Sequence, residues 1–151
     1  MPRFNSSYPE HQLYEDHKVL FPSTAMVAGI YGAAANVEIP SKTRELLLIL
    51  DVSAAALAVG DTLDATVVTR VYINGVAYWL DVCAFTQVLG NGGALTHVDK
   101  VVAGLDQATF ADAALAAGAK RHILGDAWQA AITVFGATAA FTASIDMIPM
   151  E

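Results

Sequence analysis

The sequence predicts an all-β chain: an antiparallel β-sandwich or jelly roll with an extended N-terminal arm and at most one short helix. Three observations predict this class. About seven or eight short apolar runs are separated by turn residues, several runs alternate with the period of a strand, and one Asn-Gly pair separates two runs of strong β composition. We expect the arm in residues 1–23 and the sandwich in residues 24–151.

The N-terminal stretch shows neither a helical nor a strand period, and it contains Pro9 and Pro22. It carries more aromatic and aliphatic side chains than a solvated tail needs, and such side chains are typical of interfaces. An unstructured terminus is the other interpretation. We expect the following arm residues to bind partner subunits: Phe4, Tyr8, Leu13, Tyr14, Leu20 and Phe21.

The segment 23–41 has small residues and two glycines, which indicates an extended transition into the domain. Residues 43–54 have a continuous apolar centre from Leu46 to Leu50, bounded by charge. This pattern predicts a centrally placed strand, and a short helix is the competing interpretation.

Residues 62–85 give the clearest local signal, because Asn74-Gly75 suits a two-residue type I′ turn between two strands. Pairing outward from the turn produces one nearly wholly apolar face, which we assign to the core. The expected pairs on that face are Ile73 with Val76, Val71 with Tyr78, Thr69 with Leu80, Val67 with Val82, and Ala65 with Ala84.

The other face of this hairpin is mixed, with Tyr72 opposite Ala77, Arg70 opposite Trp79, Val68 opposite Asp81 and Thr66 opposite Cys83. Here the Arg70 guanidinium can lie on the Trp79 indole. We expect this face to meet solvent or a partner, with Arg70, Tyr72 and Trp79 as contact residues.

The rest of the chain is predicted to form further strands and one short helix. Residues 85–102 predict a strand, a turn at 90–93 and another strand, and residues 106–120 predict a helix with a cap at Asp106 and an end at Gly118. Two closing strands alternate at period two, with these residues on one face: Trp128, Ala130, Ile132 and Val134, then Phe141, Ala143, Ile145 and Met147.

The composition of the chain limits the classes of partner that it can bind. Hydrophobic residues make up 55% and charged residues 15% of the chain, against about 25% charged in an ordinary soluble domain. We therefore expect part of the surface to meet another protein. The net charge of −7 argues against nucleic-acid binding. No secretory signal and no apolar run of about 18 residues is visible, so we expect no membrane partner and synthesis in the cytoplasm.

The sequence offers only weak candidates for a catalytic, phosphate-binding or metal-binding site. No G-x-S-x-G elbow accompanies the histidines, the four histidines lack metal-ligand spacing, and the glycine-rich run at 90–93 precedes no helix. Asp51, Asp61 and Asp64 lack the EF-hand pattern, and Cys83 is the only cysteine. We expect no catalytic residue, no cofactor and no metal. The histidines are His11, His17, His97 and His122.

The stretch LLLILDVSAAALAVGDTLDATVVTRVYINGVAYWLDVCAFTQVLGNGGALTHVDK resembles β-sandwich virion proteins of tailed bacteriophages, including capsid decoration (cement) proteins. In those proteins a strand of the type vvLDvs precedes a TLDvtv strand, a hairpin, aFTqv and a Gly-rich turn. Later, AKRHI and AITVFGATAAFTASI resemble their closing strands, so the resemblance covers about residues 46–148. His122 stands where an aromatic residue is usual, and the alanine-rich insert at 106–119 has no counterpart.

The resemblance implies a non-enzymatic structural protein on the outer capsid surface of a virion. It further implies a homo-oligomer, which we expect to be a trimer, whose arm binds neighbouring major-capsid subunits. A second hypothesis is a ligand- or carbohydrate-binding module of a virion surface or tail protein, with Trp79, Tyr72 or Trp128 as a sugar platform.

Overall fold

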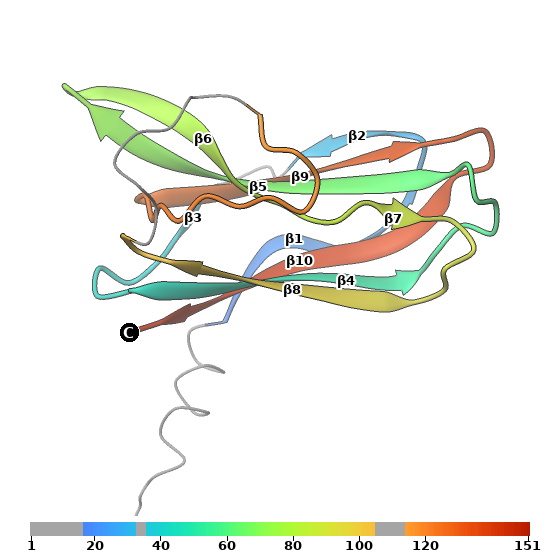
Figure 1. Ribbon diagram of the computed structural model, residues 1–151, viewed down its shortest axis with the longest axis horizontal. Coiled ribbons are helices and arrows are strands. Elements are labelled where there is room, and N and C mark those ends of the chain that lie inside the picture. Colours follow the sequence, from blue (N-terminus) through green and yellow to red (C-terminus); the bar gives the residue numbers. More distant parts are fainter. Residues whose placement is uncertain (1–16, 33–35, 105–113) are drawn as a thin grey trace, which may run out of the picture.

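The computed structural model describes residues 17–32, 36–104 and 114–151, and these form two antiparallel sheets packed face to face (Figure 1). The predicted all-β sandwich is confirmed. The described residues contain no helix long and apolar enough to span a membrane. The strands are β1 (Lys18–Val27), β2 (Gly29–Gly32), β3 (Val37–Glu38), β4 (Glu45–Ala54), β5 (Thr62–Ile73), β6 (Val76–Ala84), β7 (Val88–Leu89), β8 (Leu95–Val102), β9 (Ala127–Phe135) and β10 (Ala140–Met150).

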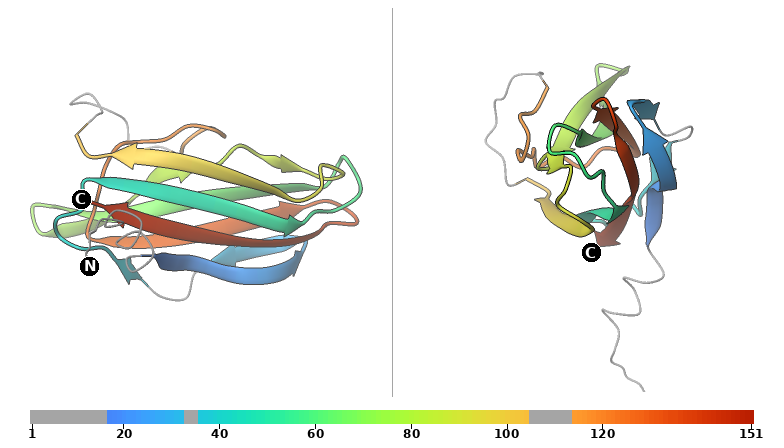
Figure 2. Two further views of the ribbon diagram at one scale, coloured as in Figure 1. Left: turned by 90° about the horizontal axis from the view of Figure 1, so that it is seen from below. Right: turned by 90° about the vertical axis from the view of Figure 1, so that its right-hand side faces the viewer.

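The strand order is that of a jelly roll. One sheet runs β1-β10-β4-β8, as Figure 2 shows from below, and the other runs β2-β9-β5-β6, with β3 on β9 and β7 on β5. Apart from the two-residue strands β3 and β7, the strands pair first with last, second with second-last, and so on to the hairpin β5–β6 in the middle. This nested pairing is one long antiparallel ribbon rolled into a sandwich.

The core lies between the two sheets and follows from strand alternation. The eight residues predicted to share a face in β9 and β10 are all buried, because inward and outward side chains alternate along each strand. β4 is a central strand, as predicted, and lies between β10 and β8 with its inward leucines buried. The largest fully buried side chains include Trp128, Phe85, Phe141, Leu46, Leu48, Leu50, Ile132, Ile145 and Met147.

The N-terminal boundary differs from the sequence expectation. Residue 23 falls inside β1, which pairs with β10 from Lys18 to Val27 and belongs to the sandwich. Leu20 and Phe21 are both buried in the core, so the structure places them inside the domain and not on an arm. Residues 1–16, with Phe4, Tyr8, Leu13 and Tyr14, lie outside the described residues.

The hairpin register is correct near the turn and wrong farther from it. The pairs from Ile73–Val76 to Val68–Asp81 are as predicted, but Val67 then pairs with Cys83 and Thr66 with Ala84. The predicted pairs Val67–Val82, Thr66–Cys83 and Ala65–Ala84 are therefore wrong. A β-bulge at Val82 inserts one extra residue into β6 and shifts every later pair by one.

The described residues between β8 and β9 form no regular strand or helix. Of the helix predicted for residues 106–120, positions 106–113 lie outside the described residues, and residues 114–120 form a turn and an isolated bridge between Cys83 and Lys120. The loop at 90–93 is present as expected, with positive φ at Asn91 and Gly93.

Candidate interaction surface on the β5–β6 hairpin

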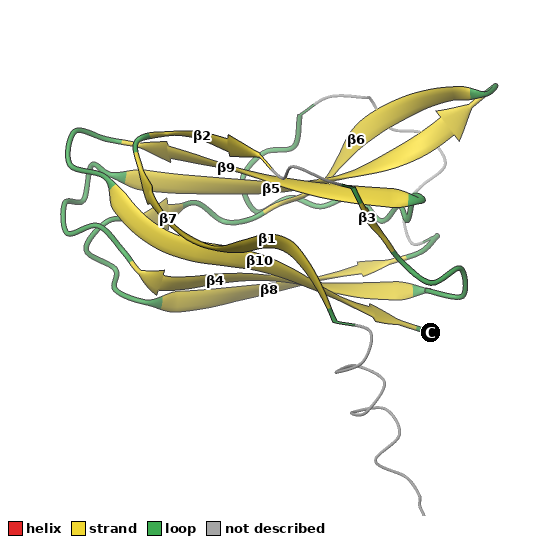
Figure 3. Cartoon of the chain, turned by 180° about the vertical axis from the view of Figure 1, so that it is seen from behind, coloured by secondary structure: helices red, strands yellow, loops and turns green. Residues whose placement is uncertain are grey.

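The β5–β6 hairpin extends beyond the body of the sandwich. The pairing of β5 with β9 ends at Arg70–Ala127, and the chain beyond that point rises away from the other strands in Figure 1 and in the opposite view of Figure 3. We call residues 71–79 the hairpin tip. The bulge at Val82 lies directly below it, and a bulge bends its strand and increases the local twist.

The hairpin tip exposes large apolar side chains on both of its faces. Tyr72 (54% exposed) and Trp79 (38%) lie on the outer face, which continues the outer surface of the sheet. Ile73 (55%), Val76 (54%) and Tyr78 (42%) lie on the opposite face. We call this the core-side face, because it continues the inward-facing residues Leu80 and Thr69.

The core-side face was expected to be buried along its whole length. Thr69 and Leu80 are buried as predicted, but Ile73, Val76 and Tyr78 are not. The reason is geometric: the hairpin is longer than the sandwich beneath it, so its last residues have no opposing sheet. A solvent-exposed apolar surface of this kind is typical of a protein-binding site.

The turn is the type I′ turn that the sequence predicts. Asn74 has a φ of 52° and Gly75 a φ of 79°, and both values lie in the region that this turn requires at its two central residues. The turn fixes the register of the tip, so the side chains are assigned to their two faces by local sequence.

The β5 side of the hairpin foot is fixed by the segment 124–126. The buried Thr69 hydroxyl donates to the Ala127 carbonyl (2.9 Å) and accepts from the Gly125 amide (3.1 Å). A Cβ at Gly125 would lie 2.0 Å from the Arg70 carbonyl oxygen, so only glycine fits this close approach. The Asp126 amide donates to the same carbonyl at 3.0 Å.

The β6 side of the foot is fixed by the segment 115–121. The Arg121 amide donates to the Val82 carbonyl (2.7 Å), and the Arg121 guanidinium donates to the Asp81 carbonyl (2.7 Å). The Leu115 amide donates to the Asp81 carboxylate at 3.2 Å. The hairpin is therefore held on both edges below the tip, and the tip is presented on a rigid base.

Arg70 joins the foot to the outer face. Its guanidinium makes a bidentate ion pair with Asp126, at 2.9 Å and 2.7 Å. It also lies 5.3 Å from the Tyr72 ring centroid and 5.9 Å from that of Trp79, which confirms the predicted contact with the indole. Hydrogen bonding to Arg70 holds the pKa of Asp126 below its ordinary value, and Asp126 raises the pKa of Arg70.

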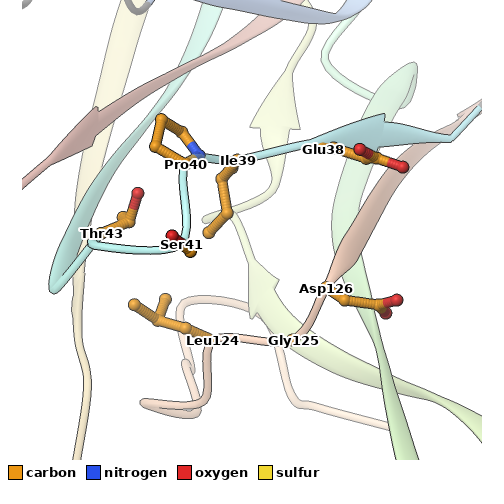
Figure 4. A pocket seen from close by; sticks show the side chains of 8 residues that line it. All are labelled: Glu38, Ile39, Pro40, Ser41, Thr43, Leu124, Gly125 and Asp126. Atoms are coloured by element: carbon orange, nitrogen blue, oxygen red, sulfur yellow. The ribbon is translucent and has the colours of Figure 1, made fainter.

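Two hollows adjoin the foot, on either side of Leu124, Gly125 and Asp126. One, of about 400 Å³, is also lined by Arg70, Val71 and Tyr72. The other, of about 340 Å³, lies against the loop after β3. Figure 4 shows Ile39 and Leu124 extending into this second hollow, with the carboxylates of Glu38 and Asp126 at one side. Both hollows are open to solvent, and the first is shallow, so neither encloses a ligand as most small-molecule sites do.

The structure brings Arg70, Tyr72 and Trp79 together and separates them from the other predicted contact residues. Leu20 and Phe21 are core residues in β1. Trp128 is fully buried between the sheets, so the prediction that it could form a sugar platform is wrong. The tryptophan lies on the inward face of β9, opposite Thr69.

The three carboxylates considered as a metal site each accept a hydrogen bond from a different side chain. Thr96 donates to Asp51 (2.9 Å), Thr138 donates to the buried Asp61 (2.8 Å), and Gln87 donates to Asp64 (3.0 Å). Across residues 17–32, 36–104 and 114–151, no three His, Cys, Asp or Glu side chains are grouped so that they could hold a metal ion.

The histidines and the cysteine are likewise dispersed. His17 lies 3.4 Å from the Asp146 carboxylate, the Val102 amide donates to His122 (3.0 Å), and His97 lies on β8. His11 lies outside the described residues. Cys83 is a buried free thiol whose Sγ lies 3.4 Å from an Asp99 oxygen. Burial, and next the negative charge of Asp99, raise the pKa of this thiol far above its ordinary value.

The sequence did not indicate Asp126, Gly125 and Thr69, which position the hairpin. Asp126 lies 56 residues from Arg70, and only the pairing of β5 with β9 brings the two together. Arg70 is the only basic residue in β5, and this was the one available signal that an acidic partner would be needed. Comparisons with protein-family models, with curated proteins and with solved structures gave no match to this chain.

Proposed function

We propose that this chain is a non-enzymatic structural protein of a bacteriophage capsid, which decorates the outer surface and cements adjacent major-capsid subunits. The observation that carries the proposal is the hairpin tip: five exposed large apolar side chains on a rigid base, in a domain with few charges. Apolar and aromatic anchors of this kind supply most of the binding energy at protein interfaces.

The fold is compatible with this function. Jelly rolls occur in viral capsid proteins, and also in lectins and cupins. This support is an analogy of fold, and fold alone does not determine function. The resemblance of residues 46–148 to virion proteins of tailed phages selects the capsid among these possibilities.

The N-terminal residues 1–16 give a second contact in this proposal. Phe4, Tyr8, Leu13 and Tyr14 supply apolar anchors on a segment that precedes β1. When several such contacts act in one oligomer, the effective concentration of each is high and weak contacts together give firm attachment. The cementing effect therefore depends on the oligomer as well as on each contact.

The test is co-sedimentation with capsids of the phage that encodes this chain, purified without the protein. We expect the full chain to pellet with capsids at a fixed ratio and to stay in the supernatant alone. Deletion of residues 1–16 should abolish pelleting and leave the sandwich folded. Undiminished capsid binding by the truncated chain would overturn the role of this segment, and no binding by the full chain would overturn the function.

A carbohydrate-binding function is the second candidate, and one observation favours it. The exposed Tyr72 lines the hollow of about 400 Å³ together with Arg70 and Asp126, and sugar sites combine an aromatic surface with charged hydrogen-bonding groups. Against it, the Arg70 guanidinium already lies over the rings of Tyr72 and Trp79. Glycan-array binding that is lost in Trp79→Ala would favour this candidate over the capsid function.

A further inference from the structure

We propose that Asn74, at the end of the hairpin tip, is a site of spontaneous deamidation, and that Asn91 is protected from the same reaction by its loop. Each residue precedes a glycine, in the pairs Asn74-Gly75 and Asn91-Gly92. Asparagine before glycine is the most reactive pair for this chemistry, because glycine has no side chain to hinder its own amide nitrogen. The two sites therefore share their local chemistry and differ in what holds them.

The reaction needs only the chain and water, so it is independent of the proposed function. The Gly75 amide nitrogen attacks the side-chain carbonyl carbon of Asn74, a C–N bond forms, and the side-chain nitrogen leaves as ammonia with the proton of the attacking nitrogen. Water then adds to either carbonyl carbon of the resulting succinimide, the bond from that carbon to the Gly75 nitrogen breaks, and the nitrogen regains a proton. The product is aspartate or isoaspartate, and each event adds one negative charge.

The folded turn must open before the succinimide ring can close. Asn74 has a φ of 52° and Gly75 a φ of 79°, as a type I′ turn requires. This turn directs the Gly75 nitrogen away from the Asn74 side chain. The rate in the folded protein is therefore the rate in an open chain multiplied by the fraction of time that the turn is open.

Little opposes opening at Asn74. Both turn residues are exposed, and a Cβ at Gly75 would meet no atom within 4 Å. The loop and turn hydrogen bonds between described backbone groups include none from either residue. The nearest restraint is the pairing of Ile73 with Val76, at the end of a two-stranded ladder that no other sheet covers. Opening here disturbs only the last pair of the hairpin.

Asn91 is equally accessible to water but is anchored. It is exposed and has a φ of 62°, so its main chain must also turn before it can react. The Asn91 amide donates to the Ala56 carbonyl (2.6 Å), and the Gly90 amide donates to the Asp61 carbonyl (2.8 Å). A Cβ at Gly90 would lie 1.8 Å from the Ala58 carbonyl oxygen, which shows how closely this loop packs on its neighbour. Opening at Asn91 therefore breaks tertiary contacts.

Deamidation at Asn74 changes the chemistry of the hairpin tip. Residues 71–80 contain no charged side chain, so the new carboxylate is the first charge among exposed apolar groups. Isoaspartate also adds one carbon to the main chain of the turn, and a two-residue type I′ turn no longer connects Ile73 to Val76. An aged chain therefore presents a different surface from a newly made one.

The first experiment incubates the full chain in mildly alkaline buffer and follows both asparagines over time by mass spectrometry. Chymotrypsin separates the two sites, because it cleaves at Tyr78 and Trp79 between them. We expect conversion at Asn74 to be about tenfold or more faster than at Asn91, since opening at Asn91 also breaks the two loop hydrogen bonds.

A parallel incubation in urea, under conditions that unfold the chain, supplies the reference for intrinsic reactivity. Both sites should then convert at similar rates, which would assign the difference in the folded protein to structure. Conversion at Asn91 as fast as at Asn74 in the folded chain would overturn the proposal. So would an unreacted Asn74 after a period in which the unfolded chain reacts.

Two matched variants test the assignment by a second readout. Asn74→Gly and Asn91→Gly each remove one site, and glycine suits the positive φ at both positions. On ion exchange, the wild type and Asn91→Gly should accumulate the same more acidic form at the same rate, and Asn74→Gly should accumulate about tenfold less or none. Thermal unfolding checks that both variants fold. Accumulation at the wild-type rate in Asn74→Gly would place the reactive site elsewhere.

Discussion

At the scale of single residues, Thr69 is the buried polar group on which the hairpin foot depends. Its hydroxyl satisfies both the Gly125 amide and the Ala127 carbonyl. A buried polar group left without a partner costs more free energy than the hydrogen bond contributed. The position therefore requires a small side chain that can both donate and accept.

We expect Thr69→Val to lower the free energy of unfolding by about 1–3 kcal/mol, because valine has nearly the same shape and cannot form either bond. Denaturant unfolding of both proteins measures the difference. Thr66→Val, on the outer face of the same strand, is the control and should change stability by less than about 0.5 kcal/mol. Equal stability of the wild type and Thr69→Val would contradict the role of this hydroxyl.

Cys83 gives the protein a pH dependence above neutrality. Burial raises the pKa of this thiol in the folded state, so the folded chain keeps a proton that the unfolded chain releases above about pH 9. The unfolded state then binds fewer protons, and stability falls as the pH rises. The contribution is complete below the unfolded pKa and is lost progressively above it.

We expect the unfolding free energy of the wild type, relative to Cys83→Ala, to fall between about pH 9 and pH 11 by up to ~1.4 kcal/mol per pH unit. Urea unfolding at several pH values measures the slope. Other groups titrate in this range in both proteins, so the difference between the two isolates the thiol. Parallel pH profiles would show that Cys83 ionises freely in the folded chain.

At the scale of elements, β1 shows where sequence patterns fail. Its pairing with β10 shifts register between Val19 and Phe21 and again between Phe21 and Thr24. As a result the consecutive residues Leu20 and Phe21 are both buried, and the strand has no period-two alternation. Pro22 is tolerated because β1 is an edge strand. A search for alternation therefore assigns this strand to an irregular arm.

At the scale of elements, we also predict how far the N-terminus can be shortened before the sandwich loses stability. Deletion of residues 1–16 leaves β1 intact and should change the midpoint of thermal unfolding by no more than a few degrees. Deletion of residues 1–22 removes half of β1 together with Leu20 and Phe21, and should lower the free energy of unfolding by more than about 3 kcal/mol. Circular dichroism melts compare the two. A fully stable 1–22 deletion would show that β1 is dispensable.

The other features of the fold depend either on neighbouring residues or on strands that are distant in the sequence. The Asn74-Gly75 turn, the face of β9 and the face of β10 were predictable, since each depends on neighbouring residues. The bulge at Val82 and the partner of Arg70 depend on strands distant in sequence. The exposure of Tyr78 was not predictable, because a pattern reveals an apolar face and not whether another sheet covers it.

At the scale of the whole molecule, net charge opposes association and apolar contact favours it. The acidic charge acts over the Debye length, which falls from about 30 Å at 0.01 M salt to about 8 Å at 0.15 M. Residues 71–79, with their exposed apolar side chains, carry no charge. Added salt therefore screens the repulsion and leaves the attraction.

We expect the proposed oligomer to become tighter as sodium chloride rises from about 0.01 M to about 0.15 M, the range over which most screening develops. Sedimentation equilibrium at several salt concentrations measures the association constant. Dissociation by salt would indicate that ion pairs between copies, and not apolar contacts, hold the proposed oligomer.

The jelly-roll order could not be predicted, because it depends on which strands meet across the whole chain. The same order has a consequence for synthesis. β10 is the last strand of the sandwich in chain order and lies between β1 and β4 in the middle of its sheet. A nascent chain that stops before residue 140 has two unpaired strand edges where β10 belongs, and unpaired edges invite aggregation. The sandwich therefore closes only after β10 has left the ribosome, and premature termination products should be targets for chaperones and proteases.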